Sequence, residues 1–122
     1  MSIDAKANNG DSRSLSYLYW SWIRHIAMEE NVTLPQSGSA TDSLTEDEAK
    51  RLASALRARA EKIRKGLAPR DATSFVQQVD KKWFPYVEGE DVGTLRADFD
   101  NPEGIDETAS FFEKSGGVTL RY

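Results

Sequence analysis

The stretch from Leu15 to Met28 constrains the fold most, because it concentrates large apolar side chains that must be buried or bound. It holds two of the three tryptophans, two of the four tyrosines and the only histidine of the chain. At 100° per residue, one side of a helix over this stretch becomes an apolar stripe. We therefore predict a helix that runs to about Glu30 and turns this stripe to the core. The stripe consists of Leu15, Leu18, Tyr19, Trp22 and Ile26, with Ile23 at its margin.

The opposite side of this helix carries Tyr17, Trp20, Arg24 and Met28, where an ordinary surface helix has only polar residues. One interpretation is that other elements of a compact domain cover this side as well. Another is that these four residues form a contact surface for a partner protein, since their types are enriched at the centres of interfaces. A cleft for a small ligand is the third interpretation.

The length of 122 residues fits one globular domain over 1–122, with a single hydrophobic core. The chain has no cysteine, which excludes disulfides, thiol catalysis and thiolate metal sites. It shows no signal-peptide pattern and no apolar run of about 18 residues, so we predict no membrane segment. A soluble, cytoplasmic protein is the expectation.

The first half of the chain offers one weak strand pattern, one loop and one clear helix start. Residues 1–11 alternate apolar and polar side chains before a turn, which predicts a short strand. Ser12 or Ser14 is the predicted cap of the aromatic helix, and residues 31–43 are predicted to form a flexible loop. The capping box of Thr45 with Glu48 then starts a helix that extends to Lys65.

The second half predicts two more helices and two more strands. A helix starts at Asp71 and ends near Phe84, before Pro85, and a strand covers Val92 to Phe99. A short helix follows Asn101-Pro102, and the last strand covers residues 118–122.

These elements predict an α+β fold, with about four helices packed on one face of a small sheet of two to three strands. If the strands over 92–99 and 118–122 are neighbours joined through the last helix, they form a right-handed βαβ unit.

His25 is the only imidazole in the chain, which excludes metal sites built from several histidines. On the helix it lies near Glu29, one turn later, so we predict a structural histidine paired with a carboxylate. The catalytic alternative is a dispersed active site that uses His25 with Glu29 or Glu30. The acidic residues near Asp98 lack the ligand and glycine positions of a calcium loop, and no glycine pattern binds phosphate. We predict no metal and no cofactor.

The net charge of −4 hides a strong segregation. Residues 1–49 carry −5, residues 50–82 carry +7 and residues 83–122 carry −6. The basic middle and the acidic ends can lie against each other or form separate faces. Nucleic-acid binding through the basic segment is therefore an alternative, although its cations spread around the helix and the pI is near 5.0. Its candidate residues are Arg51, Arg57, Lys62 and Lys65.

The leading hypothesis is a small acidic protein without catalytic activity that binds another protein. Tyr17, Trp20, Arg24 and Met28 are the candidate contact residues, and a homodimer through the same side is a variant. Inhibitors, immunity proteins and phage accessory proteins have this size and charge, which suggests a bacterial or phage source by analogy alone. The alternatives are a nucleic-acid-associated protein and an enzyme around His25.

Overall fold

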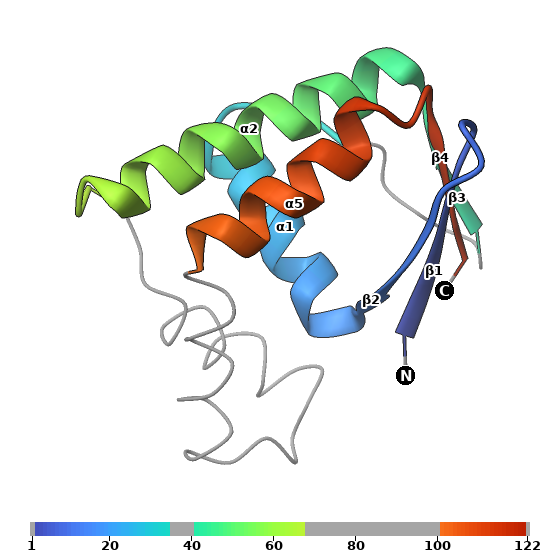
Figure 1. Cartoon of the computed structure of the whole chain (residues 1–122), viewed down its shortest axis with the longest axis horizontal. Coiled ribbons are helices and arrows are strands. Elements are labelled where there is room, and N and C mark those ends of the chain that lie inside the picture. The colour runs from blue at the N-terminus through green and yellow to red at the C-terminus, as the bar shows by residue number, and fades with distance from the viewer. Residues whose placement is uncertain (1, 35–40, 68–100, 122) are drawn as a thin grey trace.

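Figure 1 shows the computed structural model, which describes residues 2–34, 41–67 and 101–121. The side chains of residues 2, 17 and 18 lie outside this description. In chain order the elements are β1 (Ser2–Ala7), β2 (Ser12–Ser16), α1 (Tyr17–Glu29), β3 (Thr41–Leu44), α2 (Glu46–Arg64), α5 (Pro102–Glu113) and β4 (Val118–Arg121).

The four strands form one antiparallel sheet in the order β2-β1-β4-β3. The two central strands come from opposite ends of the chain, with Ala5 of β1 opposite Leu120 of β4. Asn8, in the turn after β1, is held to the segment before β4, because its backbone N–H donates to the carbonyl oxygen of Gly117 at 2.9 Å. The first and last described strands thus lie side by side at the centre of the sheet (Figure 1).

One face of the sheet is covered by helices, and the other is polar and exposed. Alternate strand residues point into the core, as Ile3, Ala5 and Leu15 do, whereas Asp4 and Ser14 between them are exposed. Helices α2 and α5 lie side by side over the inner face, and α1 contacts α2, β1 and β2 (Figure 1). The domain is therefore a helical layer on one antiparallel sheet.

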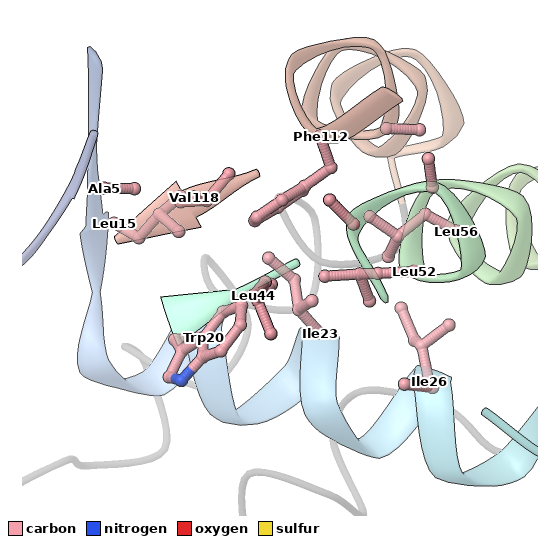
Figure 2. Packing of buried hydrophobic residues seen from close by; sticks show 14 of the residues in the cluster. Ala5, Leu15, Trp20, Ile23, Ile26, Leu44, Leu52, Leu56, Phe112 and Val118 are labelled. Atoms are coloured by element: carbon pink, nitrogen blue, oxygen red, sulfur yellow. The ribbon is translucent and has the colours of Figure 1, made fainter. Parts of the chain in front are cut away.

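Side chains from all three helices and the sheet meet in one core. Figure 2 shows Phe112 of α5, Leu52 of α2 and Ile23 of α1 pointing toward one another, with Val118 of β4 beside them. All four are buried. Burial of large apolar side chains is worth about 1.5–3 kcal/mol each, so this junction holds the layers together.

Local sequence signals account for the helix starts. The predicted capping box is present: the Glu48 backbone N–H donates to Thr45 Oγ1 at 3.1 Å, and the Thr45 N–H donates to Glu48 Oε1 at 2.9 Å. Helix α5 has Asn101 as its N-cap and Pro102 in its first turn, as predicted. The α+β class, the first strand and the last strand are likewise confirmed.

Two strands were missed, so the predicted number of two to three strands is wrong. Ser12–Ser16 is strand β2 rather than the start of the aromatic helix, and Ser16 is the N-cap of α1. The left-handed Gly10 allows a tight hairpin that pairs β2 with β1. Thr41–Leu44 falls in the predicted loop over 31–43 but forms β3, because its backbone pairs with β4. Backbone pairing, local for β2 and long-range for β3, overrides the polar composition of both strands.

Three predicted features lie outside the described residues: the helix over 71–84, the strand over 92–99 and the βαβ unit that contains it. The same holds for residues 35–40 of the predicted loop. Three of the about four predicted helices are described, and β4 pairs antiparallel with β1 and β3. None of these three helices combines the length and the apolar content that crossing a membrane requires. The single domain over 1–122 stays a prediction.

The two adjacent phenylalanines of α5 provide a matched test of this core. Phe112 is 0% exposed, whereas Phe111 is only partly buried beside it. We expect Phe112→Ala to lower the free energy of unfolding by about 3–5 kcal/mol, because it leaves a cavity where the layers meet. Phe111→Ala should cost clearly less. Urea unfolding followed by circular dichroism measures both, and equal losses would contradict the described core.

Candidate functional site

The last turns of α1 and the segment after it surround a pocket of about 530 Å³. Asn31 has a left-handed backbone with φ of 62°, and the Val32 N–H donates back to the Ala27 carbonyl oxygen at 2.7 Å. This turn folds the chain along the end of the helix. The volume lies in the range of small-ligand sites. The residues that line this α1 pocket are Ser21, Arg24, His25, Met28, Asn31, Val32, Thr33 and Leu34.

Two of the four predicted contact residues line this pocket. Met28 is 65% exposed, and within the described ranges only Leu67 is an equally exposed large apolar side chain. Arg24 is half-buried, and its guanidinium carbon lies 5.9 Å from the centre of the Trp20 ring. The pocket therefore joins an exposed apolar side chain to a cation that rests on an aromatic ring.

The prediction that Trp20 belongs to an exposed contact surface is wrong. Its side chain is 3% exposed, and its ring centre lies 6.2 Å from that of Phe112 in α5. Elements on both sides cover α1, which is the alternative interpretation of its second apolar patch. Tyr17 is the first residue of α1, and its side chain lies outside the described residues. Only Arg24 and Met28 therefore remain as described contact candidates.

A group of four residues, here called the buried charged cluster, adjoins the pocket through His25 and consists of Trp22, His25, Glu29 and Arg59. Trp22 and Arg59 are buried, and His25 and Glu29 are partly buried. The His25 ring stacks on Trp22 at 5.6 Å, and its Nε2 contacts Glu29 Oε1, as the sequence predicted for this pair. Arg59 of α2 reaches the same carboxylate oxygen with Nη2 at 3.3 Å, and its guanidinium carbon lies 5.5 Å from the Trp22 ring centre. The Glu29 carboxylate thus contacts both His25 and Arg59.

Arg59 is the charged residue that the sequence analysis missed. It is 0% exposed, and within the described ranges none of its guanidinium nitrogens forms a hydrogen bond. Its only described compensation is the carboxylate of Glu29 and the face of Trp22. The spacing of Leu52, Leu56 and Arg59 places all three on one helix face, a signal that could have identified the buried position.

Carboxylates lie within 4 Å of every basic residue from Lys50 to Lys65, including the four candidates for nucleic-acid binding. Some of these acids lie on α2 itself, whereas Glu113 and Asp106 lie on α5 and Glu30 follows α1. Described acids from both ends of the chain thus lie against α2, the described part of its basic middle. The pairs are Lys50–Glu46, Arg51–Asp47, Arg57–Glu113, Arg57–Asp106, Arg59–Glu29, Lys62–Glu30, Arg64–Asp106, Arg64–Glu61 and Lys65–Glu61.

The pairs between α2 and α5 change the acidity of their members. The hydrogen bond from Arg57 Nη2 to Glu113 Oε2 at 2.6 Å, together with the positive charge of Arg57, lowers the pKa of Glu113. The hydrogen bond from Arg64 to Asp106 raises the pKa of Arg64. Both ionised pairs favour contact between these helices. Within the described ranges, His, Asp and Glu side chains form no group of three that could hold a metal ion.

The buried charged cluster predicts unequal costs for two arginine deletions in the same helix. Arg59→Ala removes the buried cation and leaves a cavity, so we expect a loss of about 3–5 kcal/mol in the free energy of unfolding. Arg51→Ala removes an exposed pair with Asp47 and should cost about 1 kcal/mol or less. Urea unfolding of both variants tests this, and similar losses would show that the described burial of Arg59 is wrong.

The lowered pKa of Glu113 is directly measurable. NMR titration of its side-chain carboxyl should give a pKa below the ordinary glutamate value, and Arg57→Gln should raise it toward that value. Arg51→Gln is the control and should change nothing at Glu113. Because the folded-state pKa is lowered, the stabilisation by this pair is present above the ordinary pKa and is lost as pH falls through the folded value. A normal pKa in the wild type would contradict the described pair.

Comparison with known proteins adds no relative to these observations. The chain matches no protein-family model, no curated protein and no solved structure. A function therefore has to be argued from the α1 pocket, the buried charged cluster and the ion pairs of α2.

Proposed function

We propose that this protein acts by binding another protein through the surface that Arg24 and Met28 form at the α1 pocket. The exposure of Met28 beside the pocket carries the proposal. Burying a methionine side chain is worth about 1.5–3 kcal/mol, so a partner that covers Met28 would gain this free energy on binding. Methionine and arginine are both enriched at interface cores.

The ion pairs of α2 favour this proposal over nucleic-acid binding. Arg51, Arg57, Lys62 and Lys65 each lie near a carboxylate of this chain. A phosphate backbone would have to compete with these carboxylates for the same cations, and the nearby negative charges would repel it. The described cations of the basic segment, from Lys50 to Lys65, therefore have partners already, whereas Met28 is left exposed.

An enzyme around His25 is the second candidate, because His25 lines the same pocket and contacts Glu29. A carboxylate that orients a histidine is a frequent part of acid–base sites. A complementation assay in the native source distinguishes the two functions. His25→Gln should abolish the phenotype of an enzyme, whereas Arg24→Ala with Met28→Ser should abolish that of a binding protein. Full activity of a folded His25→Gln variant would remove the enzyme.

The binding proposal is tested by capture of partners from the native source, followed by titration of the purified partner. The double variant Arg24→Ala, Met28→Ser should lower affinity at least about tenfold, because two interface contacts are lost. Leu67→Ser is the matched control, since it removes an equally exposed apolar side chain that follows the C-terminus of α2. Unchanged affinity of a folded double variant would refute the surface.

A second copy of this chain is the other possible partner. Light scattering at high protein concentration distinguishes it, because the double variant would then convert a dimer to a monomer. A finer description as an inhibitor, an immunity protein or a phage accessory protein of the cytoplasm also belongs to this proposal. Its support is the size and acidic charge of the chain.

A further inference from the structure

The geometry of the α1 pocket points to the chemistry of the partner. We infer that the pocket binds an acidic peptide segment, with a carboxylate at Arg24 and a neighbouring apolar side chain against Met28. This inference rests on the proposed function, because it specifies what the partner presents to the same surface.

The charge of the pocket is the first argument. Among the described residues that line it, Arg24 is the only Lys, Arg, Asp or Glu. The two acidic residues at the end of α1 pair with basic groups other than Arg24, since Glu29 contacts His25 and Arg59 and Glu30 accepts a hydrogen bond from Lys62 at 2.6 Å. Within the described ranges, no carboxylate lies within 4 Å of Arg24. The pocket thus presents a cation to an incoming group.

The position of Arg24 is the second argument. Its guanidinium lies over the buried Trp20 ring, 5.9 Å from the ring centre, so the side chain is held at the pocket. A held guanidinium loses less conformational entropy when it binds, and its planar fork matches the two oxygens of a carboxylate. Asn31 and Thr33 line the same pocket and add hydrogen-bonding side chains.

The composition of the lining indicates which side chain lies beside the ligand's carboxylate and how much charge the ligand carries. Met28, Val32 and Leu34 provide an apolar wall, which fits an aliphatic side chain. One arginine matches the single charge of a carboxylate. A phosphate carries about two charges and is better matched by several basic groups. An acidic residue flanked by leucine therefore fits both halves of the pocket.

NMR titration of the full-length, ¹⁵N-labelled protein tests this pairing with two short peptides. Acetyl-Leu-Glu-Leu-amide should bind about tenfold more tightly than acetyl-Leu-Gln-Leu-amide, with shifts confined to residues 21–34 and the Arg24 side chain. Arg24→Gln should abolish the preference for glutamate. Met28→Ser should weaken both peptides by the same factor, and Arg51→Gln is the control that should change neither.

Several outcomes would overturn the inference. These are equal binding of the two peptides, shifts outside residues 21–34, no binding, or equally strong binding of inorganic phosphate at the same residues. The proposed function can still hold in each of these cases, because the double variant at Arg24 and Met28 is assayed against the captured partner. Retained affinity of that variant for the partner would instead refute the proposed function itself.

Discussion

The burial of helix α1 on both of its sides is the constraint on which the rest of the structure depends. The guanidinium of Arg59 in α2 lies over the Trp22 ring, and Trp20 contacts Phe112 of α5. Two tryptophans on different sides of one helix leave little of its surface for solvent. Among the described side chains of α1, only Met28 is mostly exposed, and it lines the α1 pocket together with the half-buried Arg24. The fold thus limits the possible contact surface of this helix before any partner is considered.

Ion pairs determine which charged side chains at this surface are available to a partner. The carboxylates of Glu29 and Glu30 are directed at bases of α2, one to the buried Arg59 and one to Lys62. A buried arginine requires such a partner, because an uncompensated charge in the core is strongly destabilising. The carboxylates of Glu29 and Glu30 are therefore paired with bases of α2 rather than with Arg24. Arg24 is thereby left without a carboxylate of this chain among the described residues that line the pocket.

The elements that sequence reasoning found are those that local chemistry specifies. Thr45 with Glu48, and Asn101 with Pro102, mark helix starts through hydrogen bonds within one turn. The missed strands Ser12–Ser16 and Thr41–Leu44 are polar and rich in serine and threonine, so their composition does not predict strands. β2 pairs with its neighbour β1 through a short hairpin, whereas β3 pairs with β4, which lies far along the chain. The pairing of β3 has no local signal. The α+β class could therefore be predicted, whereas the four-stranded sheet could not.

The same distinction explains the candidate site. Helical periodicity placed Trp20, Arg24 and Met28 on one side of α1, which is correct as geometry. It could not show that α5 covers Trp20 while Met28 stays open, because that depends on contacts between segments about 90 residues apart. Burial of Trp20 does not remove its role at the site, since its ring supports the guanidinium of Arg24. An aromatic residue predicted as a contact thus becomes the support for the one charged contact that remains.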